Sequence, residues 1–372
     1  MDIRLENVLK YEQPTKYIVK SENYSDDFAL PVLTAGKSFV LGYTDETEGV
    51  CKASENPVII FDDFTADCKY VDFDFKVKSS AMKILHKVNA EDNLKYYFYA
   101  MQAIDYTPFS HKRVWISEYS KFKIENRSFA EQNNIVKDLD TVATAIDNAK
   151  QRLNTLDELV KSRFIEMFGD PEINEKIWTK TTMGNYITTL TDFNANGSYA
   201  YLDSNVTMYD DPHYALMVRT TDLERNDFQN GVKYIDENAY QILSKSKVFG
   251  GEIIMNKIGS AGKIYLMPHL DRPVSLGRNA FLFRYNENIN TLFLYYQLST
   301  EYGTAEILQH VKGATTKTIT KDAAKSIKII VPPIELQNEF ADFVKLIDKS
   351  KFVCQSNPSI FCVKFLRFRH PP

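Results

Sequence analysis

The stretch IVKDLDTVATAIDNAKQRLNTLDELVKSRFIEMF, residues 135–168, decides the architecture of this chain. Its apolar side chains recur at alternating spacings of three and four residues, with one slip near Phe164, which is the pattern of a coiled-coil seam. Gly169 and Pro171 follow as a natural stop. The pattern predicts one helix of about 35 residues, which rises about 50 Å along its axis. Its seam consists of Ile135, Leu139, Val142, Ile146, Ala149, Leu153, Leu156, Val160, Phe164 and Met167.

A single helix cannot bury such a seam by itself, so a partner helix is required. Phe340, Val344 and Ile347 restart the seam pattern near the end of the chain and offer that partner. Pro358 ends this distal helix, and we expect the basic, aromatic residues 360–372 to be a truncated or frame-altered end rather than an interaction tail. We also expect another subunit to cover the part of the central seam that stays exposed, at Leu153, Leu156, Val160, Phe164 and Met167.

The sequences on either side of the central helix resemble each other. Lys112, Val114, Lys123-Ile124 and Gln132-Asn133 match residues that lie 205 positions later, namely Lys317, Ile319, Lys328-Ile329 and Gln337-Asn338. Further upstream the matches continue with shorter offsets. They pair Tyr96-Tyr97 with Tyr295-Tyr296, Ile59-Ile60 and Lys69 with Ile253-Ile254 and Lys263, and Pro31-Val32-Leu33 with Leu216-Met217-Val218. Their common order predicts an internal duplication.

Each half has the pattern of a mixed α/β domain. Short segments rich in β-branched and aromatic residues predict strands at Val58–Phe61, Lys123–Glu125, Glu252–Asn256, Ala280–Tyr285 and Ser326–Val331. Compact apolar-aromatic segments predict helices at Leu94–Met101 and Thr291–Ser299. The fold class is therefore α+β, with two similar domains separated by long coiled-coil helices. The predicted parts are residues 1–127, 128–170 for the central helix, 171–332, and 333–372 for the distal helix and tail.

Composition narrows the class of protein. Of 372 residues, 44% are hydrophobic and 25% charged, which is normal for a folded protein. The net charge is −4 and the pI about 6.0, which excludes a protein that is basic throughout but not one with a local basic face. The four cysteines show no paired spacing, which argues against a disulfide scaffold and a zinc site. The sequence begins without a secretory signal pattern and has no apolar run of membrane-spanning length, so we expect a cytoplasmic protein.

Catalytic signatures fail on inspection. The Gly36-Lys37-Ser38 segment has Pro31 where a phosphate-binding loop needs glycine, and HExxH, GxSxG and GxGxxG motifs are absent from the sequence. One alternative is a metal-dependent nuclease or methyltransferase fragment that binds Mg²⁺ through Asp62-Asp63 or Asp210-Asp211. The repeat argues against it, because Asp62-Asp63 falls opposite Asn256-Lys257. A second alternative is a coiled-coil adaptor without DNA function, which leaves the two similar domains without a reason.

Several local motifs carry a family resemblance. The segment Val331-Pro332-Pro333-Ile334-Glu335-Leu336-Gln337 and its degenerate copy Phe129-Ala130-Glu131-Gln132 look like a strand-to-helix junction. The segment Leu156–Gly169 looks like the end of a central conserved helix, and Pro57–Lys83, with Asp62-Asp63-Phe64 and Tyr70-Val71-Asp72-Phe73, resembles one class of target domain. In these features, up to about Lys351, the chain resembles the specificity subunit of type I restriction–modification systems. The tail lies outside the resemblance.

The resemblance implies a non-catalytic chain. Each of two target-recognition domains reads one half of a bipartite double-stranded DNA site, and the helices set the gap between the halves. Two modification subunits, which use S-adenosylmethionine to methylate adenine, dock on this chain, and restriction subunits that use ATP and Mg²⁺ join them. We expect no cofactor and no metal bound by this chain itself.

Candidate DNA-contacting residues lie in loops that the repeat makes equivalent. They combine cations for phosphates, Arg and Asn for base edges, and small residues that let the backbone approach. In the first half the candidates are Lys69, Lys112, Arg113 and Trp115. In the second half they are Asn256, Lys257, Ser260, Gly262, Lys263, Arg278, Asn279, Lys312, Thr315, Thr316 and Lys317.

Overall fold

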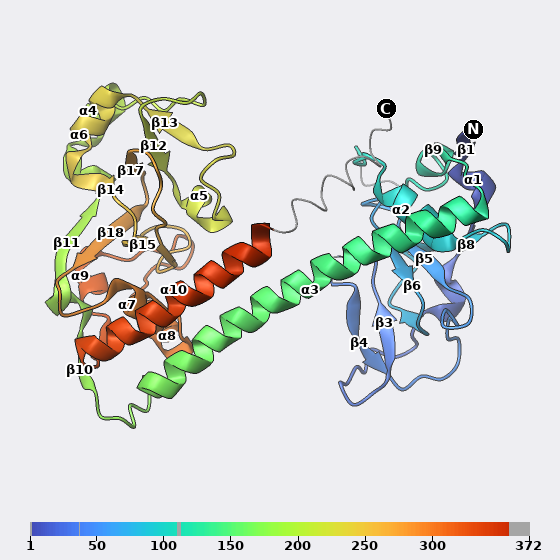
Figure 1. Ribbon diagram of the computed structural model, residues 1–372, viewed down its shortest axis with the longest axis horizontal. Helices are drawn as coiled ribbons and strands as arrows, with labels where there is room; N and C mark the ends of the chain where they lie inside the picture. Colours follow the sequence, from blue (N-terminus) through green and yellow to red (C-terminus); the bar gives the residue numbers. More distant parts are fainter. Residues whose placement is uncertain (1, 37, 110–112, 357–372) are drawn as a thin grey trace. The chain divides into compact units, whose positions relative to one another are not determined.

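The computed structural model describes residues 2–36, 38–109 and 113–356 of the chain (Figure 1). The chain divides into two compact units, here called unit 1, up to Gln151, and unit 2, Arg152–Cys354. The division falls inside the long helix α3, Phe129–Phe168, which begins in unit 1 and ends in unit 2. The predicted tail, including Cys362, lies outside the described residues.

Unit 1 contains a four-stranded antiparallel sheet of order β2-β8-β5-β6. A second sheet has the order β4-β3-β7, in which β3 and β7 run parallel, and β1 pairs with β9. The helix α2, Leu94–Gln102, packs on the first sheet. The elements before α3 are β1 Asp2–Arg4, α1 Leu5–Val8, β2 Leu9–Glu12, β3 Leu30–Leu33, β4 Val40–Thr44, β5 Val58–Asp62, β6 Cys68–Val71, β7 Lys76–Val77, β8 Met82–Lys87, α2, and β9 Lys123–Glu125.

Unit 2 repeats this arrangement with additions. Its four-stranded antiparallel sheet has the order β11-β18-β15-β16, a mixed sheet has the order β13-β12-β17-β14, and β10 pairs with β19. The strands are β10 Thr179–Thr182, β11 Ile187–Asp192, β12 Ala215–Val218, β13 Lys233–Ile235, β14 Lys247–Val248, β15 Ile253–Asn256, β16 Ile264–Leu266, β17 Val274–Leu276, β18 Ala280–Tyr285 and β19 Lys328–Val331. The helices are α4 Tyr199–Asn205, α5 Thr220–Arg225, α6 Glu237–Ile242, α7 Thr291–Leu298, α8 Glu301–Gln309, α9 Lys321–Lys325 and α10 Ile334–Ser356.

The backbone hydrogen bonds confirm the predicted duplication. The amide of Lys78 donates to Leu33 O in unit 1, and the amide of Gly277 donates to Val218 O in unit 2, with N···O distances of 2.9 and 2.7 Å. This pair places Leu33 opposite Val218, as predicted. The predicted strands and the two predicted compact helices are also confirmed to within two residues at each end.

The start of each long helix is fastened by the same four-residue contact, which we call the Gln–Asn junction. In unit 1 the Gln132 side chain accepts the amide of Asn93 at 2.8 Å and donates to Arg127 O at 3.0 Å, while Asn133 accepts from the Asn93 side chain at 2.7 Å. In unit 2 the same bonds join Gln337 to Asn290 at 2.8 Å and to Pro332 O at 2.7 Å, and Asn338 to Asn290 at 2.8 Å. The junction confirms the predicted match of the two Gln-Asn pairs.

One predicted alignment is wrong by two residues. Asn93 caps α2 by accepting the amide of Lys95, and Asn290 caps α7 by accepting the amide of Leu292. The equivalent of Tyr96 is therefore Phe293 rather than Tyr295. Both side chains are buried in their cores, which explains why aromatic character alone could not fix the register.

The seam of α3 in unit 2 packs inside the chain. In Figure 1, α10 runs beside the last turns of α3. The Phe164 ring centroid lies 5.8 Å from that of Phe293, in a stacked arrangement, and 5.5 Å, edge to face, from that of Phe340 of α10. Val160 is fully buried, and Leu156 and Met167 pack against the same core. The expectation that another subunit covers Val160 and Phe164 is thus wrong, because both are buried within unit 2. Leu153, Leu156 and Met167 are half-buried, and for them the expectation stays a prediction.

Local chemistry fixes the ends of α3. Ser128 and Glu131 bond reciprocally through backbone and side chain, which is a capping box. Gly169 adopts a left-handed φ of 73° directly after the last turn and donates its amide to Ile165 O. No helix in the described part of the chain is long and apolar enough to cross a membrane.

Candidate DNA interface

Three of the predicted loops of unit 2 meet at one end of its antiparallel sheet. The amide of Lys257 donates to Asn279 O at 2.8 Å, which joins the loop after β15 to the loop before β18. The amide of Gly259 donates to Lys317 O at 3.0 Å, and the amide of Ile319 donates to Lys257 O at 3.0 Å. Residues far apart in sequence are thereby fixed as one surface, which we call the three-loop surface.

The exposed cations of this surface differ in how strongly they are held. Lys312 and Lys317 are exposed, and within the described residues neither has an ion-pair partner. Lys263 lies 3.8 Å from Glu224, a weak surface pair. Arg278 pairs with Asp203 and lies over the Phe193 ring at 5.0 Å. Lys312 and Lys317 are therefore the side chains most available to phosphates.

A turn positions Thr315 and Thr316, which are both exposed as predicted. Gly313 opens the turn with φ of 106°, and a Cβ there would lie 2.2 Å from Thr316 O. The turn therefore requires glycine. Lys312 and Thr318 bond to each other through their backbones at 2.7 and 2.8 Å and close its base.

Lys257 is not a free cation, contrary to the expectation that it contacts DNA. Its Nζ lies 2.7 Å from Asp192 Oδ2, and Lys321 Nζ lies 3.2 Å from Asp192 Oδ1. Burial raises the pKa of Asp192, but the hydrogen bonds and charges of Lys257 and Lys321 outweigh it and hold that pKa below its usual value. The side chain of Lys257 thus fastens the three-loop surface to the end of β11.

Two further candidates are also buried, so their predicted contacts with DNA are wrong. Asn256 is 1% exposed, and its Nδ2 donates to Ser260 Oγ and Tyr265 Oη, both at 3.2 Å. Gly262 has φ of 87°, and a Cβ there would lie 2.7 Å from the Ile307 side chain. Its glycine serves close packing against α8 rather than approach to a phosphate. Ser260 itself is exposed and donates to Glu224 at 3.0 Å.

One backbone hydrogen bond of the three-loop surface has an equivalent in unit 1. The amide of Val114 donates to Asp63 O at 3.0 Å, as the amide of Ile319 does to Lys257 O. Arg113, the residue before Val114, is exposed, whereas Lys112 lies outside the described residues. In both units a residue close to an exposed cation, Arg113 or Lys317, thus bonds to the residue that follows strand β5 or β15.

Trp115 belongs to the core, so the expectation that it contacts DNA is wrong. It is 2% exposed, its ring lies 5.0 Å from the Phe61 ring, and its amide donates to Asp63 Oδ1 at 2.9 Å. Asp63 in turn pairs with Lys83 at 3.3 Å, and both side chains are 2% exposed. The position that carries Asp63 in unit 1 carries Lys257 in unit 2, so each loop is fastened by a buried ion pair of opposite polarity.

Register corrects the assignment of Lys69. Ile60 pairs with Lys69 across the β5–β6 hairpin, whereas Ile254 pairs with Tyr265 across the β15–β16 hairpin. The second hairpin is two residues longer, so Lys69 corresponds to Tyr265 and not to Lys263. Lys69 is exposed on β6 itself, outside the turn.

The paired carboxylates considered for metal binding serve the loops instead. Asp62 accepts the amide of Phe64 at 2.8 Å, Asp63 pairs with Lys83, and Asp210 pairs with Lys233. Among the described residues, no group of three His, Cys, Asp or Glu side chains could hold a metal ion.

Sequence reasoning missed Asp192, Lys321 and Glu224, which hold the three-loop surface in place. They lie on β11, α9 and α5, and each is more than 30 residues from at least one of its partners. No local pattern in the sequence announces them. Comparison of the two halves of the sequence could have drawn attention to these positions only if both halves carried the same residue types there, which they do not.

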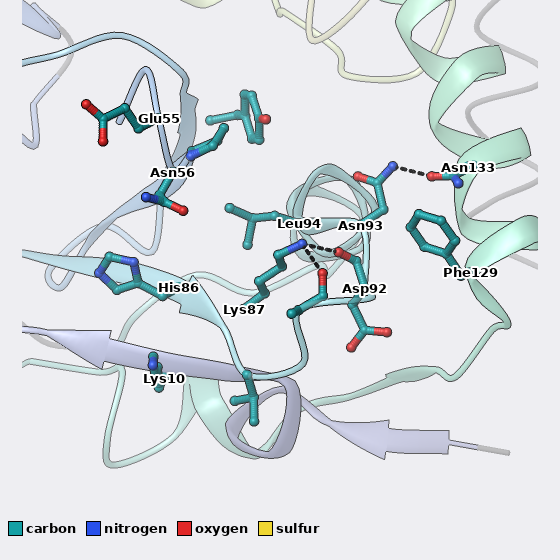
Figure 2. A pocket seen from close by; sticks show the side chains of 14 residues that line it. Lys10, Glu55, Asn56, His86, Lys87, Asp92, Asn93, Leu94, Phe129 and Asn133 are labelled. Carbon is teal, nitrogen blue, oxygen red and sulfur yellow. Dashed lines mark hydrogen bonds between the residues drawn. The ribbon is translucent and has the colours of Figure 1, made fainter. Parts of the chain in front are cut away.

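A cavity of about 730 Å³ lies at the other end of the sheet in unit 1 (Figure 2). Figure 2 shows Asn93 and Asn133 of the Gln–Asn junction on its wall, with Phe129 beside them. Lys87 Nζ donates hydrogen bonds to the backbone oxygens of Ala90, at 2.6 Å, and Asp92, at 2.8 Å. None of the predicted DNA-contacting residues lines this cavity, which lies next to Pro57 rather than next to Asp63.

Comparison with known proteins places the chain. The family model for the type I restriction modification DNA specificity domain matches residues 176–354. The specificity subunit of the type I restriction enzyme EcoR124I/EcoR124II from Escherichia coli is 34% identical over 372 residues, which cover 93% of this chain and 85% of that protein. The crystal structure of the type I restriction–modification S subunit from M. genitalium shares the fold, with a TM-score of 0.60 at 14% identity over 100% of this chain and 96% of that one. The chain therefore belongs to the specificity subunits of type I restriction–modification systems, the non-catalytic members of these multi-subunit complexes.

Proposed function

We propose that unit 1 and unit 2 each read one half of a bipartite DNA site, and that helices α3 and α10 set the spacing between the halves. The observation that carries this proposal is the matched bond at the reading end of each sheet, Val114 to Asp63 and Ile319 to Lys257. Because the two units share a fold and each has an exposed cation close to this bond, each unit is suited to bind the phosphates of one half-site.

Within unit 2 the side chains divide by chemistry. Lys312, Lys317 and Lys263 are exposed cations suited to phosphates, which fix register without reading sequence. Arg278 carries a guanidinium that suits a guanine edge in the major groove, and Asn279 carries an amide that suits a base edge. In unit 1 Lys69 and Arg113 take the phosphate-contacting part.

The partners follow from the family and are part of the proposal. Two modification subunits that bind S-adenosylmethionine dock on this chain, and restriction subunits that use ATP and Mg²⁺ complete the complex. Because Val160 and Phe164 of the α3 seam are buried within unit 2, docking does not use these two side chains.

The test is methylation mapping. The chain is copurified with its modification subunits, and methylated sites are read from a library of random duplexes. We expect a split motif, and Arg278→Ala relaxes one base position in one half only, with a discrimination loss of about 1–3 kcal/mol.

The matched variant in the other unit is Arg113→Ala, which weakens binding without changing the half that Arg278 affects. Lys345→Ala, an exposed α10 side chain paired with Asp342, serves as the neutral control. Methylation that ignores sequence, or one variant that relaxes both halves together, would overturn the proposal.

A further inference from the structure

A second cavity lies in unit 2, beside the three-loop surface. It has a volume of about 310 Å³ and sits where β11 ends and where the parallel strands β12 and β17 end together. Loops that follow such strand ends commonly form ligand crevices. Asn279 lines the cavity and also accepts the amide of Lys257, so cavity and three-loop surface share a residue.

The walls of this cavity are of two kinds. Phe193 and Met217 form an apolar part and are 3% and 1% exposed, and Met208, 50% exposed, also lines it. Thr220 and Asn279 bring a hydroxyl and an amide to the same space. An aromatic and thioether wall with a few hydrogen-bonding groups suits a flat heteroaromatic ring that has a polar edge.

Two features hold the polar side in place. Asn279 has a left-handed φ of 68°, a conformation that Asn tolerates better than most residues, and its carbonyl is fixed by Lys257. The Arg278 guanidinium lies 5.0 Å from the centre of the Phe193 ring and pairs with Asp203, and these two contacts hold it in place. The guanidinium thus lines the cavity as a hydrogen-bond donor whose charge is offset by Asp203, and the nearby cations without an ion-pair partner among the described residues are Lys312 and Lys317 of the three-loop surface.

Unit 1 does not repeat the cavity's lining. The backbone position of Gly277, which lines the cavity, is occupied in unit 1 by Lys78, whose side chain pairs with Glu22. A Cβ at Gly277 would lie 2.7 Å from Val218 O. The lining of the cavity in unit 2 is therefore not reproduced in unit 1 at this position.

We infer that this cavity accepts one nucleobase of the bound DNA, rotated out of the base stack. The inference rests on the proposed function, because it needs DNA on the three-loop surface. Apolar walls take the faces of the base, Asn279 and Thr220 take its edge, and the cations nearby favour a polyanion over a protein segment. Unstacking one base adds selectivity at a position that loops alone do not read.

Fluorescent base analogues test this directly. The full chain with its modification subunits is bound to duplexes of the mapped target, in which 2-aminopurine or pyrrolocytosine replaces each base of one half in turn. A several-fold rise in fluorescence is expected at one position of the half that unit 2 reads. Asn279→Gly keeps the left-handed backbone but removes the side-chain amide, and it should reduce that rise in complexes shown by gel shift to carry DNA.

A plug variant separates the remaining outcomes. Thr221→Trp, at an exposed residue of the cavity lining, should abolish the rise and lower affinity for the target. Sequence-specific binding without a rise at any position overturns the nucleobase inference and leaves the proposed function standing. Loss of a modification subunit from the plugged complex would identify the cavity as a protein contact and also overturn it. A wild-type complex that binds no DNA removes both proposals.

Discussion

Gln337 and Gln132 are single buried amide side chains on which the stability of each unit depends. Each is 1% exposed or less, and each joins the start of a long helix to the cap of a neighbouring helix. Gln337→Ala would leave the Asn290 amide and Pro332 O without their partners. We expect a loss of about 1–3 kcal/mol in the stability of unit 2.

Hydrogen exchange at the start of α7 and urea unfolding measure this loss. Gln132→Ala should produce the same effect in unit 1, and Gln229→Ala, at an exposed site, should produce none. Equal effects of Gln337→Ala and Gln229→Ala would show that the junction does not stabilise the unit.

Asp192 gives a dependence on pH with a definite sign. Its pKa is lowered in the folded chain, with burial opposing and Lys257 and Lys321 favouring the charged form. A lowered pKa contributes stability above the unfolded value, which is about 3.9, and this stability is lost as pH falls through the folded pKa. We expect Asp192→Asn to reduce stability at neutral pH and to flatten the decline of stability below about pH 4.

Unfolding midpoints measured from neutral pH into acid check this prediction. Asp342→Asn, on the exposed face of α10, is the matched control and should leave the acid decline unchanged. An unchanged acid decline in Asp192→Asn as well would mean that the paired lysines do not hold Asp192 charged.

At this scale the sequence predicted residue types better than their surroundings. The exposed Lys312, Thr315, Thr316 and Lys317 were predictable, because a polar turn with glycine has few other places to lie. Lys257 was not, because its partner Asp192 lies 65 residues earlier in the chain. A lysine that is buried by pairing and a lysine that is free look alike in a sequence.

Among the elements, α10 carries the packing of α3 in unit 2. Phe340 is fully buried and lies edge to face with Phe164, Phe168 and Tyr296 at centroid distances of 5.5–5.6 Å. Phe340→Ala should cost about 3–5 kcal/mol, the range for deletion of a core phenyl ring. Urea unfolding and reduced hydrogen-exchange protection in residues 156–168 measure it.

Leu346→Ala is the control, since Leu346 is 61% exposed on the same helix. A cost below about 1 kcal/mol for Phe340→Ala would contradict the packing of the two helices. Substitutions of Val160 or Phe164 report on this core and not on the docking of another subunit.

Periodicity predicted the long helix and most strands because their residue patterns are local. The apolar seam predicted that α10 is the partner of α3. It did not predict which side chains of α3 the partner leaves exposed. The two-residue error between α2 and α7 has the same origin. Aromatic residues on both helices allow several registers, and the contact that selects one, Asn93 with Gln132, joins residues 39 positions apart.

For the whole molecule, a net charge of −4 means that DNA affinity must come from local cations. Removing one cation that binds a phosphate lowers the slope of log K against log salt by about 0.9. Lys312→Ala with Lys317→Ala should therefore reduce that slope by about 2 and weaken binding to all sequences alike. Titrations of the complex at several salt concentrations measure the slope, with Lys345→Ala as the control. An unchanged slope would place the phosphates elsewhere.

The ion pairs Asp63–Lys83 and Lys257–Asp192 have opposite polarity at equivalent positions of the two units, which limits how residues can be exchanged between them. Asp63 and Lys257 occupy equivalent positions, yet the partner Lys83 has no counterpart, because register places Phe281 there and Lys257 lies over that ring at 5.7 Å. Reversing one member of a buried pair alone leaves an uncompensated charge and costs about 3–5 kcal/mol, a large share of a domain's stability. Exchanging Asp for Lys at this position, with no change of partner, is therefore strongly disfavoured, and each unit needs its own partner for this residue, Lys83 in unit 1 and Asp192 in unit 2. A domain swapped between the two halves of such a chain would therefore keep its stability only if the residue and its partner moved together.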